Sequence, residues 1–154
     1  MGKLSEWFLK KQASRLKLTS LEEFCSNLYY FADLVIKIES DGNINAKANT
    51  TSAKGLFQFT DASVDTGKNR MGNMGFDIED IREIDRNPCK WTNEQSYCMF
   101  FANIFAQRGS DKLLVKVAKK DIDSMKDAYY KFHHTNPDEA TIKRVDKIMV
   151  WIKL

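Results

Sequence analysis

The chain has 154 residues, of which 43% are hydrophobic, 29% charged and 12% aromatic. This length suits one domain with a sizeable core, and the composition excludes a mainly disordered chain. Two prolines and seven glycines disfavour collagen-like and many-turned sandwich architectures. The formal net charge of +3 is too small for a dedicated nucleic-acid binder, and it favours an anionic polymer over a cationic one.

The cysteines and the apolar runs bear on compartment and cofactors. Cys25, Cys89 and Cys98 show no ligand spacing, so we expect no zinc site, no disulfide scaffold, no other metal and no cofactor. The apolar run near the N-terminus, residues 7–9, is too short for a secretory signal. We therefore expect synthesis in the cytoplasm without a signal peptide, no membrane span and no nucleic-acid partner.

The predicted elements begin with an N-terminal arm or short helix over residues 1–19, and residues 20–154 form one domain. Ser5 is a candidate cap for the first helix, whose apolar residues are Trp7, Phe8 and Leu16.

The best-defined helix follows Ser20, which makes a capping box with Glu23. Its apolar residues recur at spacings of three and four and form one stripe: Leu21, Phe24, Leu28, Phe31, Val35 and Ile38. Residues 41–43 end this helix, with Gly42 suited to a left-handed cap.

The middle of the chain is less regular. Residues 43–60 predict a loop or a short hairpin, after which Thr60 or Asp61 caps a turn. Residues 67–87 read as irregular, with a short helix over 78–84.

The last third of the chain predicts four helices. One follows the capping box Thr92–Gln95 and stops at Gly109, a second covers 111–118, and a third runs through Phe132. The final helix starts at Asn136 and carries its apolar residues at Ile142, Val145, Ile148, Met149 and Trp151. Because nearly every element is helical, we predict a mainly α domain that is not a simple bundle.

Glu39 is the candidate for chemistry. In a helix it falls back over Leu28, Ala32 and Val35, inside the apolar stripe, and it lies in the last turn beside unpaired carbonyls. Both features disfavour the carboxylate, so we expect a raised pKa, as a general acid requires. The plain alternative is a glutamate at a fraying helix end that reaches water.

Two motifs around Glu39 resemble those of lytic transglycosylases of the lysozyme-like superfamily. In that family Glu-Ser closes a helix, as Glu39–Ser40 does here, and Gly-Leu-Met-Gln follows. Here Gly-Leu-Phe-Gln begins at Gly55, sixteen residues after Glu39, as in relatives on tailed-phage virions. A third family motif, Ala-Tyr-Asn-Ala-Gly-Pro before the last helix, resembles residues 132–137 loosely, with His133 in the Tyr place.

The resemblance implies a lysozyme-like α+β fold, helical with a short hairpin or loop after the Glu39 helix. It implies cleavage of peptidoglycan between N-acetylmuramic acid and N-acetylglucosamine, with Glu39 as general acid and then base. The muramyl 6-hydroxyl attacks the anomeric carbon and leaves a 1,6-anhydro end, so no second carboxylate is needed, unlike in ordinary glycosidases. The substrate-binding residues it implies are Ser40, Phe57, Gln58, Tyr130, His133 and His134.

The same resemblance implies a glycan strand as partner, action in the periplasm or cell wall, and virion or lysis-apparatus proteins as candidate carriers. Two alternatives stay open: a hydrolytic muramidase helped by Asp61 or a bound water, and a virion or wall-binding protein without turnover. Local alternatives stay open as well. The Ser40 hydroxyl could face water at the helix end, Gln58 could brace its loop, and the two histidines could be partners of the helix dipole.

Overall fold

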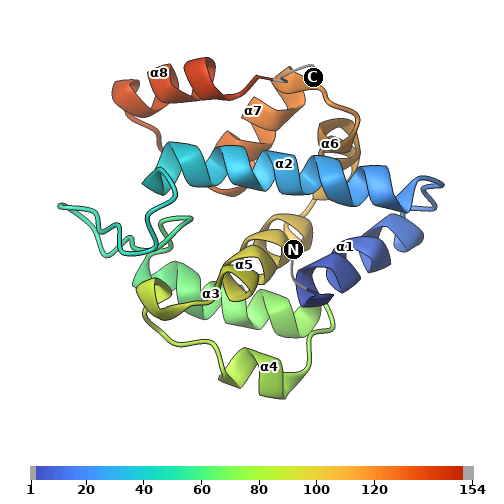
Figure 1. The fold of residues 1–154 in the computed structure, drawn as a ribbon, viewed down its shortest axis with the longest axis horizontal. Helices are drawn as coiled ribbons and strands as arrows, with labels where there is room; N and C mark the ends of the chain where they lie inside the picture. The colour runs from blue at the N-terminus through green and yellow to red at the C-terminus, as the bar shows by residue number, and fades with distance from the viewer. Residues whose placement is uncertain (1–2, 151–154) are drawn as a thin grey trace.

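The computed structural model describes residues 3–150, and the predicted helical position Trp151 lies outside them. Within that range the chain forms eight α-helices and one 3-10 turn (Figure 1). Their bounds are α1 Lys3–Arg15, α2 Leu21–Ser40, α3 Asp61–Asn73, α4 Ile78–Arg82, η1 Pro88–Lys90, α5 Asn93–Ala106, α6 Ser110–Ala118, α7 Ile122–Phe132 and α8 Glu139–Ile148. The expectation of a mainly α domain is confirmed.

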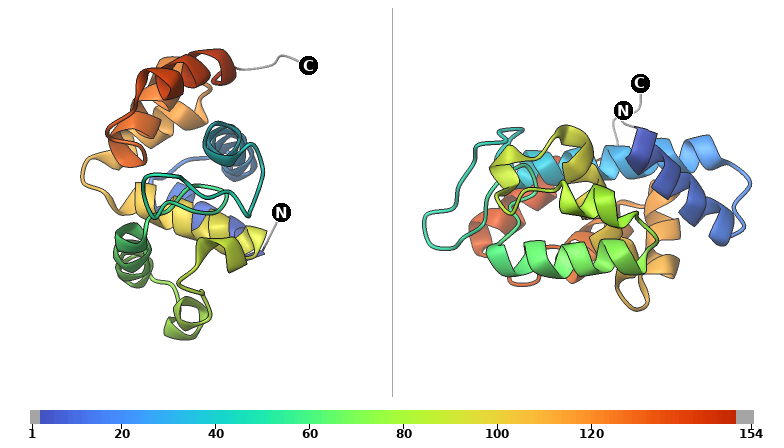
Figure 2. Two further views of the ribbon diagram at one scale, coloured as in Figure 1. Left: turned by 90° about the vertical axis from the view of Figure 1, so that its left-hand side faces the viewer. Right: turned by 90° about the horizontal axis from the view of Figure 1, so that it is seen from below.

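The segment between α2 and α3 is a loop. It holds two isolated antiparallel bridges, Lys47 to Lys54 and Lys54 to Phe59, and no strand is formed anywhere in residues 3–150. Seen from the end of the molecule that carries this loop, α7 and α8 lie on one side of it and α3 and α4 on the other (Figure 2, left). The C-terminal end of α2 therefore meets the loop and the α7–α8 pair at one place.

Helix α2 buries its predicted stripe. Phe24, Leu28, Phe31, Val35 and Ile38 are all at most 3% exposed. The predicted capping box at its start is wrong, because the Ser20 backbone (φ −105°, ψ 83°) does not aim the hydroxyl at a free N–H of the first turn. At its end both Asp41 (φ 51°), whose N–H donates to the Lys37 carbonyl, and the expected Gly42 (φ 80°) are left-handed.

Some of the other predicted helix starts are confirmed, and one is wrong. The capping box Thr92–Gln95 is confirmed, and Thr60 makes one with Ser63. Thr60 thereby starts the thirteen-residue helix α3, which runs through part of the region predicted as irregular. Helix α8 begins at Glu139 rather than next to Asn136, because the Asp138 side chain accepts the N–H of Thr141.

Helix α1 belongs to the same core as α2 and α5. Phe8, Leu9 and Ala13 are fully buried, whereas Trp7 remains 43% exposed. Ser5 lies inside α1 rather than capping it, and its N–H and hydroxyl donate to the Glu94 carboxylate at the start of α5. The N-terminal helix is thus tied to the domain by apolar packing and by hydrogen bonds to a partly buried carboxylate.

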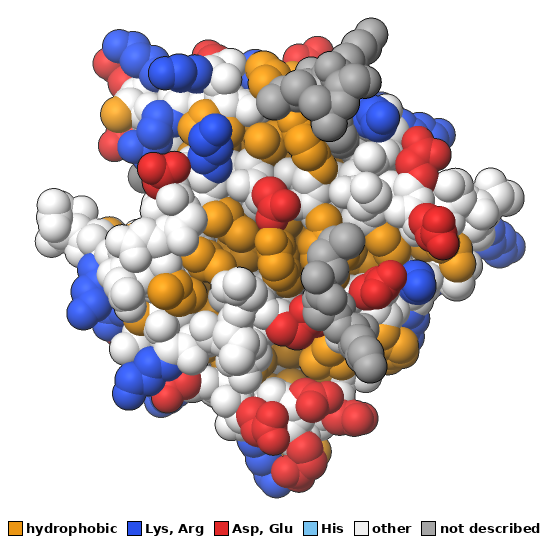
Figure 3. Space-filling view, in the orientation of Figure 1, with side chains coloured by type: hydrophobic (Ala, Val, Ile, Leu, Met, Phe, Trp, Pro, Cys, Tyr) orange, Lys and Arg blue, Asp and Glu red, His pale blue; other side chains and the backbone are white. Residues whose placement is uncertain are grey.

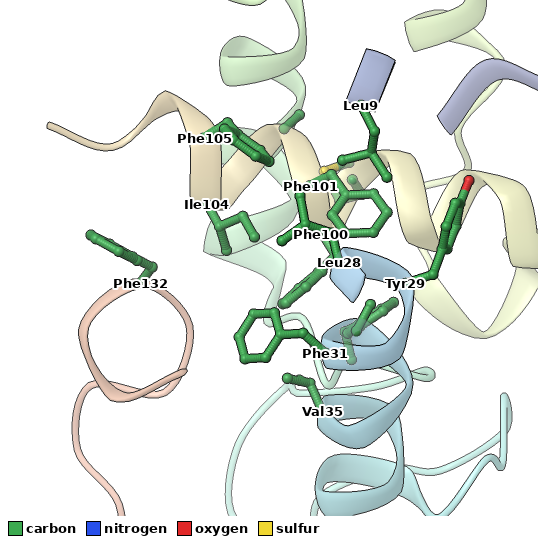
Figure 4. Close-up of a cluster of buried hydrophobic side chains, with 14 of the residues drawn as sticks. Leu9, Leu28, Tyr29, Phe31, Val35, Phe100, Phe101, Ile104, Phe105 and Phe132 are labelled. Atoms are coloured by element: carbon green, nitrogen blue, oxygen red, sulfur yellow. The ribbon is translucent and has the colours of Figure 1, made fainter. Parts of the chain in front are cut away.

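The core is rich in aromatic side chains from α2 and α5 (Figure 4). Phe31 of α2 lies beside Phe100 of α5, with 5.9 Å between ring centroids, and Phe101 packs edge-on against Tyr29. These pairs hold α2 rigidly across α5 and so fix where its C-terminal end points.

Charges of both signs lie on the surface, and their distribution is uneven (Figure 3). Helix α4 carries acidic side chains at one end of the molecule, and α8 carries Lys143, Arg144 and Lys147 at the other. No helix in residues 3–150 combines the length and hydrophobicity required to cross a membrane.

Candidate functional site

Glu39 lies in the last turn of α2, and its side chain is only 9% exposed. The apolar stripe predicted this burial, because Val35 and Ile38 on the same face are almost completely buried. The plain alternative, a glutamate that swings into water, does not describe this side chain.

Two side chains from the end of α7 converge on one oxygen of Glu39. The Tyr129 hydroxyl donates to Oε1, and His134 Nδ1 lies 3.0 Å from the same atom. Tyr129 and His134 are also 3.0 Å apart through the hydroxyl and Nδ1. The second carboxylate oxygen, Oε2, has no hydrogen-bond partner among residues 3–150 and is not completely buried.

The sequence predicted a raised pKa for Glu39, and this prediction is wrong because the pKa is lowered. Burial opposes ionisation, but the hydrogen bonds from His134 and Tyr129, together with the charge of protonated His134, outweigh it and hold the Glu39 pKa below its ordinary value. The hydrogen bond to Glu39 in turn raises the pKa of His134. At mildly acidic pH the resting site therefore holds an ionised Glu39–His134 pair.

His133 forms its hydrogen bond with the loop after α2 and not with Glu39. Its Nε2 lies 2.8 Å from the Phe57 carbonyl oxygen, and its ring packs edge-on against Phe57, Phe59 and Phe100. Burial lowers the pKa of His133, so a neutral ring donates Nε2–H to the carbonyl. This bond joins the end of α7 to the loop that follows α2.

Ser40 and Phe57 take local roles. The Ser40 hydroxyl donates to the Ile36 carbonyl 3.1 Å away, within its own helix, which differs from the water-facing alternative and gives no contact with Glu39. The Phe57 ring is 1% exposed and stacks on Phe100, with centroids 4.4 Å apart. Phe57 is thus a core residue whose backbone carbonyl receives His133.

Gln58 braces the loop and borders a cavity. Its Nε2 donates to the carbonyls of Ala46 and Gly55, at 3.1 and 2.9 Å, which matches the loop-bracing alternative. Its backbone is left-handed (φ 55°), a conformation that turns the side chain back onto the loop. Gln58 also lines a cavity of about 190 Å³ together with His133, and Glu39 is not among the residues that line it.

Gly55 explains why the motif needs glycine at its first position. Its φ is +83°, and a Cβ there would lie 2.8 Å from Pro88 Cβ. A side chain would therefore push the loop off the η1 turn.

Tyr130 lies apart from Glu39, and its neighbour Tyr129 takes the contact. Tyr130 lines a different cavity with Lys112, Lys116 and Asp127, and its hydroxyl is buried without a partner among residues 3–150. A signal for Tyr129 was present in the sequence, since Ala128–Tyr129 repeats the Ala-Tyr pair that opens the third motif.

The other carboxylates near the motif lie at the surface. Asp61 is exposed in the first turn of α3, and Asp65 pairs with Arg86 at 3.0 Å. Within residues 3–150 no three side chains of His, Cys, Asp or Glu gather as a metal site would require.

The arrangement gives Glu39 two unlike oxygens. Oε1 is fixed by two side chains that stabilise negative charge, whereas Oε2 makes no hydrogen bond within residues 3–150. A carboxyl held in this way can donate a proton from one oxygen while the other is stabilised as the anion forms, which is the requirement of general acid and base catalysis. Comparison with protein-family models, with curated proteins and with solved structures returned no match for this chain.

Proposed function

We propose that the protein is a lysozyme-like lytic transglycosylase that cleaves the glycan strand of peptidoglycan. The observation that carries the proposal is the asymmetric Glu39 carboxyl, anchored at Oε1 by Tyr129 and His134 and without a hydrogen-bond partner at Oε2 among residues 3–150. The Glu-Ser and Gly-Leu-Phe-Gln motifs support it, because the fold brings the loop of the second motif to the α7 end that holds Glu39.

The reaction would proceed in two proton transfers through Glu39. Oε2 donates its proton to the glycosidic oxygen, and the bond from that oxygen to the anomeric carbon of the muramyl residue breaks. The muramyl 6-hydroxyl then attacks that carbon, and the Glu39 carboxylate takes the hydroxyl proton. The products are a 1,6-anhydro-muramyl end and a free sugar hydroxyl, and Glu39 regains its proton.

The lowered Glu39 pKa fits this sequence once the substrate is included. Tyr129 and His134 stabilise the carboxylate that exists between the two transfers. A sugar chain lying over Oε2 excludes water, and loss of water favours the protonated form of a carboxyl. We therefore expect cleavage to be fastest on the acidic side of neutrality, where Glu39 is more easily protonated.

Replacing Glu39 by Gln tests the proposal. The amide keeps the shape of the side chain and has no acidic proton, so we expect turnover of purified peptidoglycan to fall about 10³-fold. Fragment masses from the wild-type digest should show anhydro ends, one water lighter than reducing ends. Asp61→Asn is the matched control, and it should leave turnover unchanged because Asp61 is exposed and lies outside the Glu39 contacts.

Other outcomes separate the alternatives. Reducing ends from the wild type, with loss of activity in Asp61→Asn, would establish a hydrolytic muramidase instead. Absence of turnover by the wild type on several peptidoglycans, with retained binding, would establish a wall-binding protein of this fold.

A further inference from the structure

The cavity that Gln58 and His133 line adjoins the loop and the end of α7. Its volume is about 190 Å³, and we call it the Arg70 pocket. The residues that line it are Gln58, Phe59, Thr60, Ser63, Arg70, Asn103, Phe132 and His133. Gln58 and His133 join the pocket to the motif loop and to the end of α7.

Arg70 is the cation of this pocket, and it has no acidic partner there. Its Nη1 donates to Asn103 Oδ1 at 2.6 Å. No carboxylate among residues 3–150 lies within 4.0 Å of the guanidinium. A guanidinium has five N–H donors, so one neutral acceptor leaves most of its donor capacity available to a ligand.

Asn103 holds the guanidinium in place. It is 5% exposed, and its Nδ2 donates to the Met99 carbonyl at 3.1 Å, which turns Oδ1 towards Arg70. Gly67 allows this approach, since a Cβ at that position would lie 2.7 Å from Asn103 Nδ2. Arg70 is therefore positioned by buried groups of α5 rather than left free at the surface.

Gln58 adds an acceptor at the edge of the same pocket. Its Nε2 is engaged by two backbone carbonyls, and its Oε1 has no partner among residues 3–150. A cation beside a neutral acceptor suits a ligand that presents a carboxylate and an amide N–H close together.

We infer that the Arg70 pocket binds a carboxylate carried on the lactyl branch of muramic acid. The inference rests on the proposed function and adds to it a specificity: strands with acidic branches are favoured over an uncharged chitin chain. The acid can be the lactyl carboxylate itself or a carboxylate of the attached peptide, since Arg70 would bind either through paired N–H donors.

Binding measurements on the inactive Glu39→Gln protein test the pocket without turnover. N-acetylmuramic acid and N-acetylglucosamine differ by the lactyl group, so they form a matched pair of ligands for NMR titration. We expect the acid to bind roughly tenfold or more tightly. Adding Arg70→Gln should remove that difference and leave the affinity for N-acetylglucosamine unchanged.

Two further variants guard the result. Arg70→Lys keeps the positive charge but loses the paired N–H donors of the guanidinium. This variant should therefore retain part of the preference for the acidic sugar that Arg70→Gln loses. Arg86→Gln removes an exposed arginine that pairs with Asp65, and it should leave both affinities unchanged. Thermal unfolding of each variant shows whether a loss of binding comes from loss of the fold.

The outcomes separate this inference from the proposed function. A dipeptide-bearing muramic acid that binds through Arg70 would identify the peptide carboxylate, and one that does not would identify the lactyl acid. Equal affinity for the two sugars with no Arg70-dependent gain for the dipeptide-bearing muramic acid, or a preference that survives Arg70→Gln, would overturn the inference even if the wild type cleaves peptidoglycan. An Arg70-dependent preference in a protein without turnover would overturn only the proposed function.

Discussion

At Glu39, the two oxygens of one carboxyl group meet different surroundings. Tyr129 and His134 are 90 and 95 residues away in the chain, and both contact Oε1. Burial of the carboxyl favours the neutral form, and these contacts favour the charged one. The contacts prevail, so Glu39 is a stronger acid than its burial alone would make it.

Removing His134 should shift the pH dependence of cleavage. Because the His134 hydrogen bond helps to lower the Glu39 pKa, His134→Gln should raise that pKa. Cleavage requires protonated Glu39, so the alkaline limb of kcat/KM against pH should move to higher pH in the variant. The measurement is initial rate on soluble glycan strands across the range from acid to neutral pH.

The control for this shift is Lys131→Gln, which removes an exposed positive charge from α7 without a contact to Glu39. The alkaline limb of the pH profile of Lys131→Gln should coincide with that of the wild type. A His134→Gln limb that stays in place or moves to lower pH would contradict the role assigned to the pair.

Among the elements, α3 shows how tertiary packing overrides local sequence. Its glycines at 67 and 72 weaken a helix locally, and this composition predicted an irregular segment after residue 66. The Thr60–Ser63 capping box starts the helix, and close contact with α5 at Gly67 holds it. The packing of α3 on α5 is thus what places Arg70 beside Asn103.

The two glycines of α3 give a matched test of that packing. A Cβ at Gly67 would lie 2.2 Å from Met99 Sδ, whereas one at Gly72 would meet only Ile81 Cδ1 at 3.9 Å. Gly67→Ala should destabilise the protein by about 1–3 kcal/mol through overpacking. Gly72→Ala should be neutral or stabilise it by about 0.5–1 kcal/mol. Urea unfolding of both variants checks this, and equal stabilities would contradict close α3–α5 packing.

Over the whole molecule, α1 closes the core rather than extending from it. Three of its side chains are fully buried against α2 and α5, and Ser5 is held by Glu94. Folding of residues 20–154 therefore depends on the N-terminal helix for part of its apolar burial.

Two neighbouring aromatic residues of α1 test this dependence. Phe8 is fully buried and stacks on Phe76, whereas Trp7 is 43% exposed. Phe8→Ala should cost about 3–5 kcal/mol of unfolding free energy. Trp7→Ala should cost clearly less than Phe8→Ala, because the Trp7 ring is only partly buried and meets Phe76 edge-on. Chemical denaturation provides both values, and a small loss for Phe8→Ala would mean that α1 is a detachable arm.

The sequence by itself determined the features that depend on near neighbours. Apolar residues at helical spacing predicted α2 and its buried face, hence the burial of Glu39, because periodicity acts within a few turns. Helix starts could be predicted where a side chain caps its own helix, as at Thr92 and Thr60. At Ser20 the same pattern predicted a capping box that does not form, because the backbone conformation at Ser20 cannot be read from the sequence.

Only the tertiary structure decided which groups meet at Glu39 and in the Arg70 pocket. Of two adjacent tyrosines, α7 turns Tyr129 to Glu39 and Tyr130 to another cavity, and of two adjacent histidines it is His134 that reaches the carboxyl. These contacts join residues far apart in the chain, and their hydrogen bonds reverse the pKa direction that burial alone predicts. Local patterns establish that a side chain is buried, and the charge it carries there depends on partners that only the packing of helices supplies.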